Sequence, residues 1–282
     1  MAGKPEVVET VEVLRSKVAA FRDAGEKVAL VPTMGALHEG HIALVRQAKT
    51  LARRVIVSIF VNPTQFAPNE DFSRYPRTFE TDIDLLAAED TDMVYAPSGA
   101  DMYPDGFATA FTMGGPALGL ETDFRPHFFS GVAIVVSKLL IRTGPDFAMF
   151  GEKDYQQLKV VTRLASDLDL PVAIVPGTTV REHDGLALSS RNRYLSPEER
   201  AIAPVIQQAL KDAGAAIRAG TPADAAATAA QERIAAAGLK VDYVAARHAE
   251  TLAPLTGQSG EPIRLLAAAW LGKTRLIDNM GV

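Results

Sequence analysis

The stretch from Lys27 to Val61, KVALVPTMGALHEGHIALVRQAKTLARRVIVSIFV, predicts the fold of the N-terminal part of this 282-residue chain. It begins with the short apolar run KVALVP and ends with RVIVSIFV, a continuous, β-branched run typical of a buried strand. Between them, HIALVRQAKTLA has the periodicity of an amphipathic helix. Strands that are apolar on both faces belong to a parallel sheet covered by helices. We therefore expect a strand–turn–helix–strand unit here.

The same alternation continues through the first 180 residues. A helix over 10–25 precedes the first strand, with Thr10 as its N-cap and Gly25 past its end. Apolar periodicity indicates further helices over 79–90, 131–144 and 154–168, and further strands over 93–97, 146–151 and 171–180. Residues 1–180 are expected to form a Rossmann-like α/β domain with a doubly wound parallel sheet.

Residues 181–282 have a different pattern. A helix is predicted over 196–220, because Ser196 is a good N-cap, Pro197 suits the first helical position and Glu199 completes a capping box. An alanine-rich helix follows the GTPAD segment. Strands are expected over 240–247, 263–271 and 274–280, the last two joined at Gly272–Lys273. We therefore expect a smaller C-terminal α+β domain.

Composition excludes several classes of protein. With 48% hydrophobic and 22% charged residues, the chain can bury a core and should be globular. It has no cysteine, which excludes disulfides, thiolate nucleophiles and cysteine-ligated metal sites. A net charge of −5 argues against nucleic acid as a general partner. No run is long and apolar enough for a signal peptide or a membrane span, so we expect a cytoplasmic protein without a membrane partner.

The turn PTMGALHEGH, residues 32–41, follows the first strand of the unit and precedes its helix. Open α/β sheets bind ligands at such carboxyl ends of strands, and a helix start favours phosphate. Gly35 allows a close turn, and His38 and His41 are donors suited to phosphate oxygens as charge builds up in a transition state. The alternative, that both histidines are ordinary loop residues, is the more common case for an isolated HxxH. A metal site is less favoured, because the motif is not HExxH.

Three other stretches carry side chains suited to a nucleotide or an acid. FGEKDYQQ, residues 150–157, supplies a glycine and a lysine after a strand, and LALSSRNRYL, residues 186–195, supplies hydroxyls beside an arginine. FVNPTQF, residues 60–66, supplies the neutral amides of Asn62 and Gln65 at a strand end. A single such cation is usually solvated surface. Two such turns on one sheet, PTMGALHEGH and FGEKDYQQ, favour a nucleotide site.

These motifs, with YPRT at residues 75–78, resemble in order and spacing the pantothenate synthetase family of the HIGH-type nucleotidyltransferase superfamily. The resemblance runs from about residue 28 to 195 and continues more loosely to the C-terminus. It implies ATP-dependent condensation of pantoate with β-alanine through a pantoyl-adenylate, with release of pyrophosphate and then AMP. It also implies Mg²⁺, a cytoplasmic homodimer, and a smaller C-terminal domain that covers the site.

The resemblance further implies roles for particular residues. His41 matches the position of proton donation, with His38 beside it, and Lys153 would neutralise phosphate charge. Gln65 and Gln157 match the pantoate-binding amides, and Gln65 also lies near β-alanine. The nucleotide-binding positions are Met34, Gly35, Ala36, Leu37, His38, Glu39, Gly40, His41, Gly151, Glu152, Lys153, Asp154, Val180, Leu188, Ser189, Ser190 and Arg191.

The chain departs from the family pattern in RPHFFSG, where His127 stands one residue earlier than the family's histidine and Phe128 takes its place. A role for His127 is therefore in doubt. Arg125 would assist either the phosphates or an adjoining loop. Asp82 and Asp84 are candidates for holding Mg²⁺, but exposed helix carboxylates are the favoured interpretation, with Mg²⁺ bound mainly by ATP oxygens and water and no metal ligand assigned to the protein.

Two other functions stay open. One is a related enzyme that transfers AMP to a phosphorylated acceptor, against which the neutral amides and the Ser-Ser-Arg stretch argue. The other is a non-catalytic nucleotide-binding module, which the intact histidines, lysine and arginine disfavour. A nicotinamide-dependent dehydrogenase is not expected, because no GxGxxG follows a strand.

Overall fold

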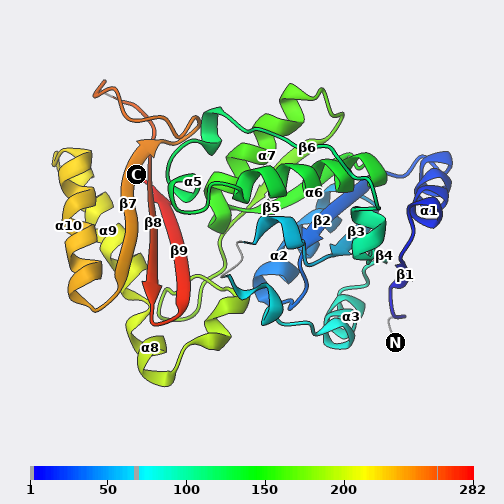
Figure 1. Ribbon diagram of the computed structural model, residues 1–282, viewed down its shortest axis with the longest axis horizontal. Coiled ribbons are helices and arrows are strands. Elements are labelled where there is room, and N and C mark those ends of the chain that lie inside the picture. Colours follow the sequence, from blue (N-terminus) through cyan, green and yellow to red (C-terminus); the bar gives the residue numbers. More distant parts are fainter. Residues whose placement is uncertain (1–2, 67–69, 259) are drawn as a thin grey trace. The chain divides into compact units, whose positions relative to one another are not determined.

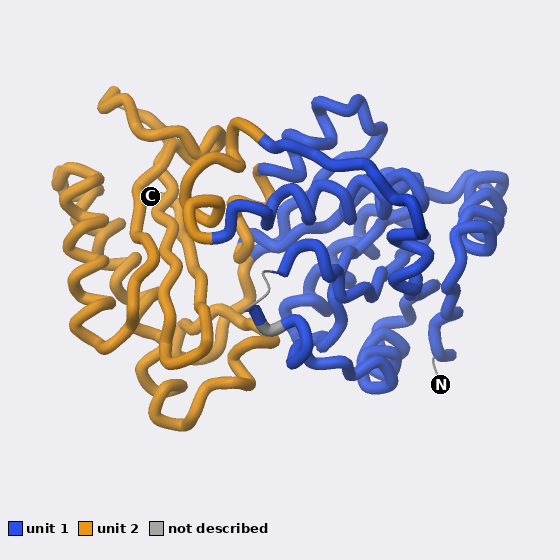
Figure 2. Tube along the Cα trace, in the orientation of Figure 1, with its two compact units in different colours: residues 1–113, 125–152, 160–178 blue, residues 114–124, 153–159, 179–282 orange. Residues whose placement is uncertain are grey.

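The computed structural model describes residues 3–66, 70–258 and 260–282. Its contacts divide the chain into two compact units, coloured separately in Figure 2. Unit 1 contains residues 1–113, 125–152 and 160–178, and unit 2 contains residues 114–124, 153–159 and 179–282. Unit 1 holds a six-stranded sheet and unit 2 a three-stranded one.

All strand pairs of the unit 1 sheet are parallel, and the strand order is β1-β4-β3-β2-β5-β6 (Figure 1). The strands are β1 (Glu6–Val8), β2 (Val28–Thr33), β3 (Arg54–Ile59), β4 (Met93–Tyr95), β5 (Phe147–Gly151) and β6 (Ala173–Gly177). The chain runs from β2 outward to β3 and β4, then returns to pair β5 with the other side of β2. This is the predicted doubly wound, Rossmann-like arrangement.

Helices cover both faces of this sheet, as the apolar strands require. The helices of unit 1 are α1 (Val11–Asp23), α2 (Glu39–Leu51), α3 (Phe79–Ala88), α4 (Gly99–Met102), α6 (Phe128–Thr143) and the part of α7 (Tyr155–Asp167) that follows residue 159. Val31 and Val57 point to one face, where they share a core with Val45 of α2 and Leu86 of α3. Because side chains alternate along a strand, Leu30 of β2 points to the opposite face, beside which α1 and α6 pack together.

Unit 2 is built on the antiparallel strands β7 (Lys240–His248), β8 (Ile263–Leu271) and β9 (Thr274–Gly281). Its helices are α5 (Glu121–Phe124), α8 (Pro197–Ile202), α9 (Val205–Arg218) and α10 (Ala223–Ala236). Alanines of α10 pack with Leu210 of α9 and Leu265 of β8 in one apolar core. The alanine-rich segment is therefore a packed helix, as its apolar periodicity predicts.

Local signals locate most of the longer helices and strands correctly. Thr10 caps α1 and Ser196 forms a capping box with Glu199, both as predicted. The single helix expected over 196–220 is wrong, because the chain forms α8 and α9 with a break at Ala203 and Pro204. Proline has no N–H and its ring obstructs the preceding turn, so it starts a new helix here. Sequence periodicity also misses β1, whose three residues are too short to show a period.

No helix in residues 3–66, 70–258 and 260–282 is both long and apolar enough to cross a membrane.

Candidate active site

The strand order of unit 1 puts a topological switch point between β2 and β5. Ala29 pairs with Phe147 and Leu30 with Ala148, so the carboxyl ends of the two strands open at the same edge of the sheet. Ligands of open α/β sheets bind at this place. The turn over 34–41 follows β2, and Gly151 and Glu152 follow β5. Two of the predicted nucleotide-binding segments therefore leave neighbouring strands at the edge where such a site is expected.

Most of the backbone N–H groups in the turn after β2 donate hydrogen bonds to side chains of the protein. Gly35 donates to the Thr33 hydroxyl at 3.2 Å, and Ala36 and Leu37 each donate to the Asp82 carboxylate at 2.9 Å. Because these amides are already bonded, phosphate recognition at this turn would depend on side chains rather than on a cradle of backbone amides. This differs from the phosphate-binding loops that present bare backbone N–H groups.

His38 and His41 cap the start of α2 with their imidazole rings. The Nδ1 atom of His38 accepts from the backbone N–H of Gly40 at 3.1 Å, and Nδ1 of His41 accepts from the backbone N–H of His38 at 3.3 Å. A ring nitrogen that accepts a hydrogen bond carries no proton, so in the neutral rings Nε2 carries it. Each histidine is thus set up to donate from Nε2. Both are partly exposed, and their ring centres lie 4.1 Å apart.

The sequence analysis favoured an exposed helix carboxylate at Asp82, and this prediction is wrong. Its residue is 1% exposed, and its two oxygens accept from Ala36, Leu37 and the Thr78 hydroxyl. Asp84 is exposed as expected and pairs with Lys4 at 2.8 Å. The difference arises because α3 turns only one of the two carboxylates toward the turn after β2. No hydrophobic signal marks which one, so the sequence could not distinguish them.

The neutral amides after β3 form a connected group. Buried Asn62 donates from Nδ2 to the backbone carbonyl of Gly131 at 3.2 Å and to Oε1 of Gln65 at 3.1 Å. Its Oδ1 accepts from the Tyr103 hydroxyl at 2.6 Å. A phenol is protonated at neutral pH, and burial raises the pKa of Tyr103 further. Asn62 therefore orients the amide of Gln65, with Oε1 held and Nε2 directed toward Met34, 3.1 Å away.

Arg125 contacts the loop that carries Gln65. Its guanidinium donates to the Gln65 backbone carbonyl at 3.1 Å and to both carboxylate oxygens of Glu70 at 2.6 Å. It also lies over the ring of Phe128, with 3.9 Å from the guanidinium carbon to the ring centre. Phe128 thus offers a cation–π face where the family pattern has a histidine. His127 is exposed and makes no side-chain capping bond at the start of α6.

Lys153 and Asp154 belong to unit 2, in the short 3₁₀ turn Glu152–Asp154. The backbone carbonyl of Lys153 accepts from the Asn279 side chain at 2.9 Å, and its ammonium lies 3.7 Å from the Asp154 carboxylate. Gln156 is buried and donates to the carbonyls of Pro116 and Gly119, which makes it a structural amide. Gln157, the predicted pantoate ligand, is only partly buried.

A hairpin-like loop brings Val180 next to Leu188. The N–H of Leu188 donates to the carbonyl of Val180 at 3.0 Å, and Arg181 and Ala187 form an isolated antiparallel bridge between them. Ser189 then caps the 3₁₀ segment Ser190–Tyr194, with its hydroxyl accepting from the N–H of Arg191 at 3.3 Å. Two predicted nucleotide-binding segments separated in sequence are therefore adjacent within unit 2.

The predicted residues are thus divided between the units. Unit 1 carries Met34, Gly35, Ala36, Leu37, His38, Glu39, Gly40, His41, Gln65, Gly151 and Glu152, and unit 2 carries Lys153, Asp154, Gln157, Val180, Leu188, Ser189, Ser190 and Arg191.

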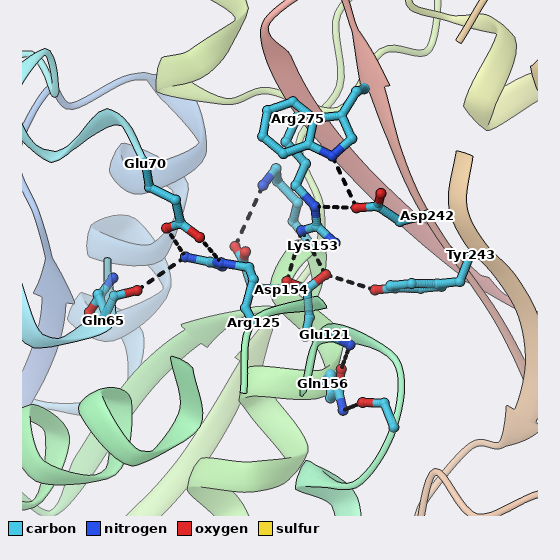
Figure 3. A network of polar contacts seen from close by, with 12 residues as sticks. Gln65, Glu70, Glu121, Arg125, Lys153, Asp154, Gln156, Asp242, Tyr243 and Arg275 are labelled. Atoms are coloured by element: carbon cyan, nitrogen blue, oxygen red, sulfur yellow. Dashed lines mark hydrogen bonds and ion pairs between the residues drawn. The ribbon is translucent and has the colours of Figure 1, made fainter. Parts of the chain in front are cut away.

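A buried ion network in unit 2 has no signal in the sequence. Arg275 of β9 donates to both oxygens of Glu121 and to Asp242 of β7, each at 2.8 Å (Figure 3). Burial alone would lower the pKa of Arg275, but the two carboxylates outweigh it and the pKa is raised. Tyr243 donates to Glu121 at 2.9 Å, and burial together with that carboxylate raises its pKa well above the ordinary value. The network ties the 114–124 segment to the small sheet.

A parallel, doubly wound sheet with phosphate-suited turns at its switch point defines a Rossmann-like protein with a smaller C-terminal domain. The model of the pantoate-beta-alanine ligase family matches residues 6–281. The chain therefore belongs to the pantoate-beta-alanine ligase family.

Individual relatives agree with this assignment. A protein of Rhodopseudomonas palustris named pantothenate synthetase is 56% identical over 283 residues, with 100% of both chains covered. A solved pantothenate synthetase from Thermus thermophilus has a TM-score of 0.91 at 46% identity, covering 98% of each chain. A pantoate-beta-alanine ligase from Francisella tularensis, solved in complex with beta-gamma ATP and beta-alanine, has a TM-score of 0.83 at 36% identity, covering 98% of this chain and 97% of that one.

Proposed function

We propose that this chain catalyses the reaction that names its family, the ATP-dependent condensation of pantoate with β-alanine to give pantothenate, and that the reaction passes through a pantoyl-adenylate. The family match over residues 6–281 supports the assignment of the overall reaction. The observation that supports the two-step route is the histidine pair, because two Nε2 donors at the turn after β2 suit phosphate oxygens.

The chemistry explains why phosphate has to be handled. A carboxylate is a poor electrophile, since it is already anionic. In the first step a pantoate oxygen attacks the α-phosphorus of ATP, a new P–O bond forms and pyrophosphate leaves. In the second step the β-alanine amine attacks the activated carbonyl, a C–N bond forms and AMP leaves. The first step needs charge stabilisation and in-line positioning rather than a covalent protein intermediate.

The roles proposed for the side chains follow from their chemistry. His38 and His41 donate from Nε2 to phosphate oxygens, and Lys153 supplies a positive charge suited to phosphate. Gln65, oriented by Asn62, and Gln157 bind pantoate through neutral amides, and Gln65 also lies near β-alanine. The nucleotide contacts are proposed for Met34–His41, Gly151–Asp154, Val180 and Leu188–Arg191.

Mg²⁺ is proposed as a companion of ATP rather than a resident of the protein. Among the described residues no three or more histidines and carboxylates gather as a metal cage. Asp82, the best placed carboxylate, already has both oxygens bonded to donors. Mg²⁺ commonly binds through substrate phosphates and retained waters, where it neutralises phosphate charge.

We also propose a homodimer in the cytoplasm, on the family likeness, and a domain boundary near residue 180. Sedimentation of the purified chain tests the first, with a monomer at micromolar concentration as the contrary result. Limited proteolysis tests the boundary, which predicts cleavage near 180 before cleavage inside either domain.

Isotope exchange tests the central proposal. Purified protein with Mg²⁺ should exchange labelled pyrophosphate into ATP when pantoate is present and β-alanine is absent, whereas net AMP formation should need both acids. Exchange that requires a phosphorylated acceptor and ignores pantoate would assign the chain to an AMP-transferring enzyme instead. Nucleotide binding without exchange for any acid would indicate a non-catalytic module.

A further inference from the structure

The turn after β2 is held in an unusual backbone conformation. Gly35 has φ of 80° and Ala36 has φ of 50°, so two successive residues lie in the left-handed region. A Cβ at Gly35 would lie 3.1 Å from the Asp82 carboxylate and 3.2 Å from Ile59, and the positive φ would strain any other residue there. For Ala36 the left-handed conformation costs about 1 to 2 kcal/mol, and it persists only where the surroundings impose it.

Asp82 supplies that constraint. Its Oδ2 accepts from the N–H of Ala36 and its Oδ1 from the N–H of Leu37, both at 2.9 Å. The Thr78 hydroxyl holds the same Oδ1 at 3.1 Å. Hydrogen bonds from neutral donors to a carboxylate are among the stronger ones in proteins, and the buried site excludes competing water.

His38 follows these two amides directly, and its position depends on them. Its backbone N–H is bonded to the His41 ring, and its own ring is bonded to the N–H of Gly40, so hydrogen bonds couple both imidazoles to the backbone of the turn. A displacement of the Leu37 amide would therefore be passed to both rings.

We infer that Asp82 is a positioning residue for adenylation: its carboxylate holds the backbone of residues 35–37 and thereby sets where the His38 and His41 rings stand. This inference rests on the function proposed above. In this role Asp82 acts through the backbone of the turn.

The sharpest test is Asp82→Asn, which keeps the shape of the side chain but replaces one oxygen with an NH₂ group. That group faces the N–H of Ala36 or Leu37, donor against donor, so one amide loses its partner. The matched control is Asp84→Asn, which removes the same charge from the same helix at an exposed position. Thr78→Val is a milder variant that removes only the hydroxyl donor to Asp82.

Two measurements on these variants, pyrophosphate exchange and imidazole NMR, test the positioning role. In pantoate-dependent pyrophosphate exchange, Asp82→Asn should lower the maximal rate on the order of tenfold to a hundredfold, the scale of a misplaced catalytic group, with the pantoate KM nearly unchanged. Thr78→Val should lower it less, and Asp84→Asn should leave it at the wild-type value. In imidazole NMR spectra of the chain's 5 histidines, Asp82→Asn should shift the His38 and His41 signals alone.

The outcomes are distinguishable. If the wild type shows no exchange with pantoate, the proposed function fails. If the wild type exchanges and both Asp82→Asn and Thr78→Val exchange at its rate, the positioning role is refuted. Recovery of Asp82→Asn activity by excess Mg²⁺ would also overturn it, since that result identifies a metal ligand. Should Asp82→Asn not fold, Thr78→Val with the NMR readout decides the question.

Discussion

The Nδ1 atom of His41 accepts a hydrogen bond from the backbone N–H of His38, and the two ring centres lie 4.1 Å apart. With the bond from Gly40 to the His38 ring, this is a capping box made of imidazoles. A carboxylate in a capping position satisfies helix N–H groups with oxygens that carry no proton to donate. An imidazole does the same with Nδ1 and still presents a proton on Nε2. An imidazole can therefore cap a helix and also serve as the phosphate donor proposed for these two histidines.

Removing either ring should abolish most adenylation while costing little stability. His38→Ala and His41→Ala each lose a donor that acts on charge developed in the transition state. Each also loses one capping bond, worth about 0.5 to 2 kcal/mol, which corresponds to a melting shift of about a few degrees. Pyrophosphate exchange and thermal melting measure the two effects. The double variant should lose little more than either single one, because the rings act as a unit.

His248→Ala is the matched control, since the His248 ring also accepts backbone N–H groups, from Glu250 at 3.2 Å and Thr251 at 3.4 Å. It should melt slightly lower and exchange normally. Near-normal exchange in both His38 and His41 variants would refute their catalytic role. Stoichiometric zinc, or a collapse of the melting temperature, would support a metal site or a core role instead.

Lys153→Ala and Gln157→Ala should fail in different ways. Loss of the ammonium should cost about 2 to 4 kcal/mol of transition-state stabilisation in adenylate formation, the scale of one preorganised donor. Loss of the amide should instead raise the pantoate KM and leave the ATP KM nearly unchanged. Steady-state kinetics with each substrate varied separates the two. Lys159→Ala, which breaks a 2.7 Å ion pair with Glu250, controls for the loss of a lysine charge nearby in the sequence and should leave both KM values alone. Equal effects of both changes on both substrates would show that the pockets are wrongly assigned.

Gly131→Ala should displace the loop that carries Gln65, which is proposed to bind pantoate. In a helix interior, alanine normally stabilises relative to glycine by about 0.5 to 1 kcal/mol. Here the added methyl would collide with the Thr64 carbonyl oxygen, so the loop that carries Gln65 must move. We expect a lower melting temperature and a higher pantoate KM. Gly99→Ala, where nothing lies within 4 Å, should behave like the wild type in both measurements. An unchanged pantoate KM in Gly131→Ala would separate this loop from pantoate binding.

Because of Tyr243, the free energy of unfolding should fall at alkaline pH. Its pKa is raised well above the ordinary value by burial and by Glu121, whereas in the unfolded chain it is about 10. The raised pKa contributes stability that is fully present below the unfolded pKa and is lost as pH rises through and beyond about 10, because only the unfolded state then releases the proton. Denaturant unfolding at about pH 8 and about pH 11 measures the loss.

Tyr243→Phe lacks this proton, so its free energy of unfolding should fall less between those two pH values than that of the wild type. Tyr194→Phe, at a residue 36% exposed, is the control and should track the wild type. Equal pH dependence in wild type and Tyr243→Phe would show that Tyr243 titrates normally in the folded state.

The sequence by itself determined the features that depend on near neighbours in the chain. Apolar periods placed the main strands and helices, and the caps at Thr10 and Ser196 follow from bonds that reach only three residues. The turns at the strand ends were visible for the same reason, and with them the candidate phosphate and amide residues. Pro204 shows the limit of periodicity even locally, since the apolar pattern runs through the helix break.

Only the tertiary structure decided which polar groups are buried and what holds them. Asp82 and Asp84 look alike in FETDID, yet one is buried against an amide 45 residues away and the other pairs with Lys4 in solvent. Arg275 and Glu121 meet across 154 residues, and β1 becomes a strand only because β4 pairs with it. A buried charge is stable only where donors converge on it, and that convergence is a property of the folded chain rather than of any segment.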